Sequence, residues 1–432
     1  MDLQLHIVQS GQTLYSIGRQ YGLAPGLIAR YNGLHEPYRL AAGQCLLILK
    51  PGAVYTVRPG DTLYAIARRF GTDVRTLWRD DPNLSGGTTI YPGQTIVLQL
   101  ESARTRPVQV LGYAYPAVRE RVLRGILPYA ATLCPFTYGI ASDGTLARPN
   151  DAALVQLARE YGTDAYLHLS TRTEEGVFSA ARAEAVLESP ALSQRLIDET
   201  VRQMQRGGYR GVDVDFEFLG AALADAFTGF LGRLRAAVNA AGGTLLTALA
   251  PKTNAAQRGA LYEGHNYPRI AENSDLVLLM TYEWGYTYGP PMAVAPIGAV
   301  RRVAEYALTE IPAEKILLGF PNYAYNWTLP YAAGESRAQS IGNEEAAELA
   351  AQVGAEIRFD ETAQTPYFSY TDARGAAHEV WFEDPRSCAA KFALVSELGL
   401  RGLGYWNFMR PFTSSFSLLN YQFSILSGQT AY

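Results

Sequence analysis

The sequence predicts an α/β protein, a (β/α)8 barrel with a small α+β insertion, preceded by two small βααβ units. Three features support this prediction. A motif is repeated within the first hundred residues, strand-like and helix-like segments alternate after it, and one later stretch interrupts that alternation. With 432 residues, of which 48% are hydrophobic and 18% charged, the chain can build a large core. Its length allows roughly two to four domains.

The repeat pairs residues 7–23 (IVQSGQTLYSIGRQYGL) with residues 56–72 (TVRPGDTLYAIARRFGT). In both copies a glycine turn precedes a threonine, Thr13 or Thr62, at the position of a helix N-cap. The residues expected on one helical face are Leu14, Ile17 and Tyr21 in the first copy, and Leu63, Ile66 and Phe70 in the second. A second helix and a short apolar strand follow, so each copy is predicted to form a βααβ unit.

The remaining chain alternates strand-like with helix-like segments, which is typical of a parallel barrel. The expected strands are VQVLGYAYP, ATLCPFTYGI, TDAYLHLS, GVDVDFEFL, TLLTALAPK, SDLVLLMTYEW, KILLGFPNYAYNW and GLGYWNF. Turn signals and alternating polarity predict an antiparallel insertion between the seventh and eighth strands. The expected boundaries are 4–50 and 53–99 for the units, 100–108 for a linker, and 109–425 for the barrel, with the insertion at about 328–385.

The fourth strand segment, GVDVDFEFL, carries three acids at alternate positions, Asp213, Asp215 and Glu217. Alternate residues of a strand share a face, so the three carboxyl groups are expected to point the same way. Inside a barrel they are costly unless they are protonated, paired or at the open rim. The alternative is a solvated edge strand.

The three acids are expected to differ in protonation. Asp213 and Asp215 are like charges at short range, so one of them should hold a proton. Glu217 is nearest the C-terminal end of the strand, where the active sites of such barrels lie. In a partly dry rim it can keep its proton and donate it to a leaving oxygen.

Composition excludes several classes of function. The net charge of -4 gives no reason to expect nucleic-acid binding. No apolar stretch is long enough to cross a membrane, so no membrane span is expected. The three cysteines are far apart and lack metal-ligand spacing, and histidines number only 5. We therefore expect no metal site, and the proton-transfer chemistry expected of the three acids needs no metal and no organic cofactor.

The repeated motif resembles the LysM module over nearly all of residues 4–50 and 53–99. This resemblance implies binding to polymers that contain N-acetylglucosamine, such as peptidoglycan or chitin. Two weak sites on one chain would raise avidity. The alternative is a repeat that binds no ligand.

The acidic strand resembles the DxxDxDxE signature of family 18 glycoside hydrolases, and the resemblance covers about residues 108–420. It implies that Glu217 protonates the glycosidic oxygen while the 2-acetamido group of the substrate attacks the anomeric carbon. It further implies that Asp215 orients the acetamide and stabilises the oxazolinium, and that Asp213 tunes Asp215 through a shared proton. Arg210 stands where the signature has its first acid, which indicates a divergent branch.

The same resemblance extends to substrate contacts. In LLMTYEWG, Met280, Tyr282 and Glu283 match a Met-x-Tyr-Asp motif, with glutamate in place of the usual aspartate. It implies that Tyr282 donates a hydrogen bond to the acetamide carbonyl and that Trp406, in GLGYWNF, lies under the reacting sugar. Further aromatic residues near strand ends are expected to line the groove, with core packing as the alternative: Tyr113, Tyr138 and Tyr325.

The stretch TYEWGYTYGPPMAVAPI, together with the paired modules, resembles the spore cortex-lytic N-acetylglucosaminidases of endospore-forming bacteria. The N-terminus lacks the basic and apolar regions of a signal peptide. The resemblance implies synthesis in the mother cell and a place in the spore cortex or coat, or otherwise at the cell wall. Two alternatives remain open: a chitinase or chito-oligosaccharide hydrolase, and a non-catalytic lectin for chitin or peptidoglycan.

Overall fold

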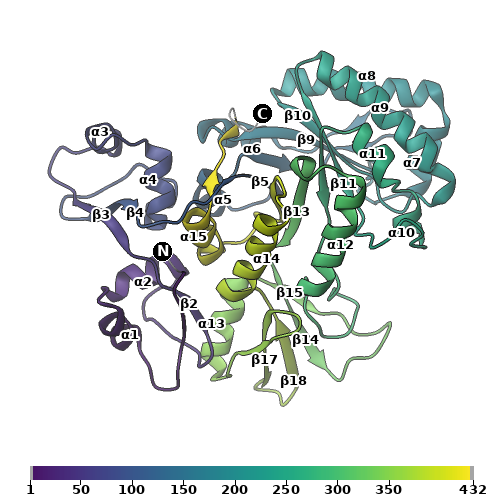
Figure 1. The fold of residues 1–432 in the computed structure, drawn as a ribbon. Helices are drawn as coiled ribbons and strands as arrows, with labels where there is room; N and C mark the ends of the chain where they lie inside the picture. The colour runs from purple at the N-terminus through teal and green to yellow at the C-terminus, as the bar shows by residue number, and fades with distance from the viewer. Residues whose placement is uncertain (1–2, 429–432) are drawn as a thin grey trace.

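The computed structural model describes residues 3–428, which form two N-terminal modules, a barrel and an insertion (Figure 1). The barrel strands are β5 (Pro107–Ala114), β6 (Thr132–Pro135), β9 (Asp164–Ser170), β10 (Gly211–Asp215), β11 (Thr244–Leu249), β12 (Leu276–Leu279), β13 (Ile316–Pro321) and β19 (Gly402–Trp406). Neighbouring strands are parallel, and β19 pairs with β5 to close the sheet. The predicted eight-stranded barrel is therefore confirmed. Strand β20 (Ser424–Ile425) adds a short parallel pairing to β5.

Helices surround the barrel and cover the apolar outer faces of its strands (Figure 1). They are α5 (Glu120–Ile126), α6 (Ala152–Glu160), α7 (Ala180–Glu188), α8 (Pro190–Gly207), α9 (Ala224–Ala240), α10 (Ala260–Glu263), α11 (Tyr267–Glu272), α12 (Ile297–Glu310), α14 (Pro385–Glu397) and α15 (Thr413–Gln422). Short elements complete the connections: η2 (Leu127–Tyr129), β7 (Gly139–Ile140), β8 (Leu146–Ala147), η3 (Ala221–Leu223) and η4 (Ala313–Lys315). Within residues 3–428, no helix has the length and hydropathy needed to cross a bilayer.

The insertion lies between β13 and β19, as predicted, and extends away from the barrel (Figure 1). It contains β14 (Ala324–Leu329), β15 (Gln339–Ile341), α13 (Asn343–Val353), β16 (Arg358–Asp360), β17 (Thr365–Thr371) and β18 (Ala377–Trp381). The strands form one antiparallel sheet in the order β15-β14-β18-β17-β16. The expected seventh strand segment is divided between β13 and β14, so the insertion sheet begins at Ala324, before the expected start near residue 328.

Both N-terminal modules have the predicted βααβ order. The first contains β1 (Leu5–Ile7), α1 (Leu14–Tyr21), α2 (Pro25–Asn32) and β2 (Cys45–Leu47), and the second contains β3 (Pro51–Thr56), α3 (Leu63–Arg69), α4 (Val74–Asp80), η1 (Pro82–Leu84) and β4 (Thr95–Leu100). The hydroxyl groups of Thr13 and Thr62 accept hydrogen bonds from backbone N–H groups at the start of α1 and α3, as N-caps should. Phe70 departs from the expected buried face: it follows the end of α3, is 45% exposed and packs against Tyr55.

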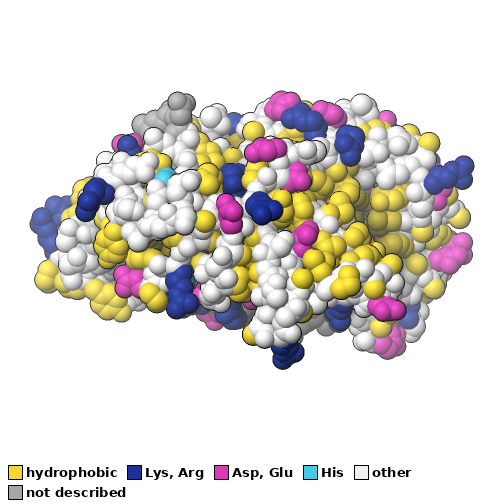
Figure 2. All heavy atoms as spheres, turned by 90° about the horizontal axis from the view of Figure 1, so that it is seen from below, with side chains coloured by type: hydrophobic (Ala, Val, Ile, Leu, Met, Phe, Trp, Pro, Cys, Tyr) yellow, Lys and Arg dark blue, Asp and Glu magenta, His cyan; other side chains and the backbone are white. Residues whose placement is uncertain are grey.

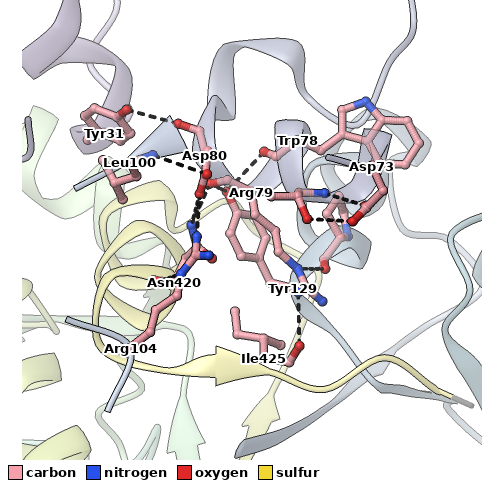
Figure 3. Close-up of polar contacts among 12 residues, drawn as sticks. Tyr31, Asp73, Trp78, Arg79, Asp80, Leu100, Arg104, Tyr129, Asn420 and Ile425 are labelled. Carbon is pink, nitrogen blue, oxygen red and sulfur yellow. Dashed lines mark hydrogen bonds and ion pairs between the residues drawn. The ribbon is translucent and has the colours of Figure 1, made fainter. Parts of the chain in front are cut away.

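The second module docks on the barrel through polar side chains of α4, the half-buried Arg79 and the buried Asp80 (Figure 3). Arg79 donates hydrogen bonds to the backbone carbonyls of Pro128, at 2.6 Å, and Ile425, at 3.0 Å. The carboxylate of Asp80 accepts from Arg104 and from Asn420, each at 2.8 Å. Burial lowers the pKa of Arg79 to about 9, which leaves the guanidinium charged at neutral pH.

The expected linker over 100–108 is also attached to the barrel. The backbone N–H groups of Ala103 and Thr105 donate to the carbonyls of Tyr421 and Gln422 at the end of α15. In the first module, helix α2 packs on α15, and the carbonyl of Ala42 accepts from Ile357 N–H in the insertion. Module side chains that join the main barrel core are Tyr31, Leu47, Leu49 and Leu100. Each module thus keeps a small core of its own and also contributes apolar side chains to the barrel core.

We expect Arg79→Ala to lower the free energy of unfolding of the whole chain by about 3 kcal/mol, because it removes two charge-assisted hydrogen bonds, although the Pro128 carbonyl keeps its hydrogen bond from Arg75. Urea denaturation followed by circular dichroism would measure this change. The matched control is Arg68→Ala, since Arg68 is exposed on the neighbouring helix α3. Equal stability of the two variants would contradict the docking described above.

Candidate active site

A cleft of about 350 Å³ lies at the C-terminal ends of the barrel strands. Carboxyl and aromatic side chains dominate its lining: Tyr113, Tyr115, Phe136, Phe178, Asp215, Glu217, Ala248, Pro251, Leu261, Tyr262, Met280, Tyr282, Glu283, Trp284 and Trp406. Figure 2 shows hydrophobic side chains gathered over the barrel part of the face seen from below. The cleft combines apolar walls with a few converging polar groups, as small-molecule and sugar sites do.

The acidic segment enters this cleft at the end of β10. Asp213 is fully buried within the strand, Asp215 is its last residue, and Glu217 follows just beyond it. Between the two cleft acids, Phe216 points outward and stacks on Phe227 and Phe230 of α9. The outward anchoring of Phe216 leaves both neighbouring carboxyl groups directed into the cleft.

Phe218 does not continue the expected alternation. Its φ of 58° places it in the left-handed region, and its side chain is 57% exposed. A phenylalanine in that region is unusual, because its Cβ crowds the backbone. The chain turns there and leaves the barrel wall, so the strand is shorter than the sequence pattern indicates.

A buried histidine that the sequence analysis did not single out fixes this turn. His265 accepts from Ala250 N–H through Nδ1 and donates to the carbonyl of Phe216 through Nε2, each at 2.9 Å. Burial lowers the pKa of His265 to about 4, so the ring is neutral and carries its proton on Nε2. His265 thereby links the loops after β10 and β11 and holds the backbone next to Glu217.

Asp213 contacts a second unpredicted histidine. His168, on the adjacent strand β9, lies with Nδ1 at 2.7 Å from Asp213 Oδ2 and Nε2 at 3.8 Å from Asp215 Oδ2. An imidazole ring thus faces both carboxyl groups, and the expected sharing of a proton between Asp213 and Asp215 stays a prediction. The two strands align His168 directly with Asp213 in register.

The cleft shifts the proton affinity of its acids. Burial, the nearby charge of Glu217 and that of Asp213 raise the pKa of Asp215 well above its ordinary value, while His168 acts in the opposite direction. Burial also raises the pKa of Glu217. Groups with such shifts in a cleft are candidates for acid–base chemistry.

Four more of the predicted contact residues line the cleft. Met280 and Tyr282 directly follow β12, Tyr113 lies near the end of β5, and Trp406 ends β19. The Trp406 ring packs against the rings of Tyr113 and Phe136, with centroids 5.4 and 5.0 Å apart. These contacts form a rigid aromatic floor beside Asp215.

Glu283 also lines the cleft, and it is held from the insertion. Its carboxylate accepts hydrogen bonds from the hydroxyl groups of Tyr323 and of Tyr325, the latter at 3.0 Å. Its φ of 68° places it in the left-handed region, a strained conformation that is common at functional sites. Tyr325 does not itself line the cleft, contrary to expectation, and contacts it only through Glu283.

Tyr138 is wrongly predicted as a groove residue. It is buried outside the cleft. Its hydroxyl oxygen lies 3.0 Å from the hydroxyl oxygen of Tyr209 and 3.0 Å from the amide nitrogen of Gln203. The strand-end position was a poor guide here, because Tyr138 faces the outer layer of helices rather than the barrel mouth. Within residues 3–428, no group of three or more His, Cys, Asp or Glu side chains is arranged to hold a metal ion.

Several cleft residues come from loops that carry no regular pattern. Phe178 lies between β9 and α7, Leu261 and Tyr262 belong to the short helix α10, and Trp284 follows β12. Only the aromatic run in TYEWGYTYG signalled one of them. Their approach to the cleft depends on how the loops fold back.

Comparison with known proteins agrees with this geometry. The family described as "Glycosyl hydrolases family 18" matches residues 174–410, and the LysM domain matches residues 6–48 and 55–99. The chain is 38% identical to the cortical fragment-lytic enzyme of Bacillus subtilis over 98% of this chain and 99% of that one. It is 34% identical to the cortical fragment-lytic enzyme of Bacillus anthracis, with the same coverage.

Solved structures agree at the level of the whole chain. The spore cortex-lytic enzyme SleL of Bacillus megaterium superposes with a TM-score of 0.83 at 35% identity, covering 98% of this chain and 99% of that one. SleL of Bacillus cereus superposes with a TM-score of 0.84 at 33% identity, covering 99% of both chains. The chain is thus a glycoside hydrolase: it belongs to family 18 of the glycosyl hydrolases and carries two LysM domains ahead of its catalytic barrel.

Proposed function

We propose that this enzyme cleaves N-acetylglucosaminyl linkages in peptidoglycan, in particular that of the spore cortex, with retention of configuration. One observation carries the proposal. A half-buried acid, Glu217, stands beside Asp215 in an aromatic cleft at the mouth of the barrel. The relatives whose printed names refer to cortical fragments match nearly the full length of the chain, which supports cortex as the polymer. We accordingly place the enzyme at the spore cortex or coat, made in the mother cell.

Glu217 is assigned as the acid that protonates the glycosidic oxygen. A raised pKa keeps its carboxyl protonated at a pH where an exposed glutamate is ionised. When the bond to the leaving sugar breaks, the proton moves from Glu217 to the departing oxygen. The resulting carboxylate then accepts a proton from the water that completes hydrolysis.

Asp215 and Tyr282 are assigned to the acetamido group of the substrate. The acetamide oxygen attacks the anomeric carbon, so the N–H must be held by an acceptor and the oxygen by a donor. Asp215 supplies the acceptor and the Tyr282 hydroxyl the donor, since both line the cleft next to Glu217. Trp406 provides the flat ring on which the apolar face of the sugar lies.

The LysM domains are assigned to polymer binding. At equivalent positions of the repeat, Tyr15 and Tyr64 expose their rings to solvent, each at 70%. Exposed rings with a polar tip suit stacking on sugars. Two such sites on one chain increase the residence time on an insoluble wall.

Incubation with purified cortex fragments and, separately, with chitin oligomers tests the proposed polymer, with products identified by mass spectrometry. We expect faster release of products from cortex fragments. Faster cleavage of chitin oligomers would make the enzyme a chitinase, and binding without any product would make it a lectin.

Glu217→Gln is expected to lower kcat by about 10³-fold or more, because an amide cannot donate the proton that the leaving group needs. Binding to cortex fragments should be retained, since the amide has nearly the same shape. The matched control is Glu175→Gln, because Glu175 is exposed on the β9–α7 loop. Wild-type turnover in Glu217→Gln would refute the assignment.

Tyr282→Phe and Tyr138→Phe form a second matched pair. The first is expected to lower kcat by about 10²-fold with unchanged stability, since it removes a donor used in the transition state. The second is expected to lower the free energy of unfolding by about 1 kcal/mol while kcat is kept, since Tyr138 only bonds buried partners. Steady-state kinetics and thermal unfolding distinguish the two, and reversed effects would contradict the cleft described here.

The double variant Tyr15→Ala/Tyr64→Ala is expected to weaken binding to insoluble cortex by about 30-fold, from the loss of roughly 1 kcal/mol of stacking per ring. Hydrolysis of short soluble oligomers should be unchanged, because both rings are exposed. Cosedimentation with cortex and oligomer kinetics measure the two properties. Parallel loss of both would show that the rings matter for folding instead.

A further inference from the structure

His168 occupies a fixed place beside the acidic cluster of Asp213, Asp215 and Glu217. It is fully buried on β9, between β6 and β10 in the sheet order. Its ring stacks on Phe136, with centroids 4.7 Å apart and planes at 25°, and meets the edge of Tyr113 at 5.2 Å. Two aromatic neighbours therefore prevent the imidazole from turning away from β10.

Each nitrogen of this ring faces a different carboxyl group. Nδ1 lies 2.7 Å from Asp213 Oδ2, which is hydrogen-bond distance, and Nε2 lies 3.8 Å from Asp215 Oδ2. Within residues 3–428, neither Nε2 of His168 nor Oδ1 of Asp215 has a hydrogen-bond partner. The gap of 3.8 Å between Nε2 and Asp215 Oδ2 is longer than a hydrogen bond, and a small rotation of Asp215 toward the ring would close it.

The protonation of the cluster follows from this arrangement. A fully buried Asp213 carboxylate needs a donor, so Nδ1 carries a proton and donates it. Nε2 then has two possible states. It either carries a second proton and faces an Asp215 carboxylate, or presents a lone pair to a protonated Asp215. The two states differ only in which atom holds one shared proton.

We propose that His168 is a positioning residue that takes the proton of Asp215 whenever Asp215 must act as a carboxylate. Before substrate binds, the proton is shared between Asp215 Oδ2 and His168 Nε2. When the acetamido N–H arrives, the proton moves to Nε2, and Asp215 accepts the N–H. The imidazolium so formed lies between two carboxylates. When the product leaves, the proton returns to Asp215.

No other nearby group can take this part. The remaining titratable side chains around His168 are Cys134, next to Asp213, the Tyr113 hydroxyl, and Glu217 and Tyr282 beyond Asp215. All of them are acids that are neutral or negative. Among the cleft-lining residues that the structure describes, none is a lysine or arginine. His168 is thus the one group in the cluster able to become positive.

This inference rests on the proposed function for the role of Asp215, and His168→Asn tests it. The asparagine amide can still donate to Asp213 but has no atom to hold the second proton. We expect kcat to fall by about 10²-fold with KM within about threefold. Without the imidazolium, Asp215 binds its proton more tightly. In the pH profile of kcat/KM, the acidic limb, where the rate falls as pH decreases, should therefore move to higher pH by about one unit.

His168→Gln is the matched second variant. Its longer side chain carries a neutral amide toward Asp215, so it can donate there but cannot accept a proton. It should show the same upward movement of the acidic limb. A purely structural histidine predicts a uniform loss across pH with the limb unmoved, and that result in either folded variant would overturn the proposal.

A measurement without turnover separates this inference from the proposed function. Nitrogen-15 NMR of the full chain, which has only 5 histidines, reports the protonation of each ring nitrogen. We expect His168 to keep its Nδ1 proton throughout and to titrate at Nε2 together with the Asp215 carboxyl signal. Independent titration of the two groups would overturn the proposal even if Glu217→Gln is inactive. Joint titration in a chain whose Glu217→Gln variant stays active would instead refute only the assignment of Glu217 as the acid.

Discussion

Carboxyl groups are costly to remove from water, and β10 brings two of them, Asp213 and Asp215, into the barrel, with Glu217 close behind. The surrounding structure offsets that cost. His168 faces the two aspartates, Phe216 anchors the segment from outside, and His265 holds the backbone at the turn. The same burial that makes the acids costly also raises the pKa of Glu217, which suits it to donate a proton.

The insertion and the modules support this centre in different ways. The insertion supplies two tyrosines, Tyr323 and Tyr325, that hold Glu283 at the cleft wall. The modules contribute apolar residues to the barrel core, and hydrogen bonds of Arg79 and Asp80 hold the second module in place. A polymer-binding part and a cleaving part are consequently packed as one body.

The sequence predicted the features that have strong local signals. The repeat predicted the modules and their N-caps, and the alternation of acids along β10 predicted which side chains face the cleft. Tyr138 and Tyr325 were misplaced because a position near a strand end does not tell which side of the barrel wall a ring faces. His168 and His265 were missed because their roles come from register with β10 and from a loop crossing, which a lone histidine in a sequence does not reveal. The docking of the second module was equally hidden, since it depends on Arg79, which looks like an ordinary surface residue of a short helix in the sequence.

The firm seating of α2 and α4 on the barrel sets the reach of the enzyme. A module on a flexible tether lets a catalytic site sweep a volume whose radius grows with tether length. Here the modules are packed on the barrel, so the distance between the modules and the cleft is fixed. Each binding event therefore presents one stretch of glycan to the cleft, and the modules must dissociate before a bond elsewhere can be cleaved. Weak binding by each module is then an advantage, because a module that dissociated slowly would keep the enzyme at glycan that it has already cleaved.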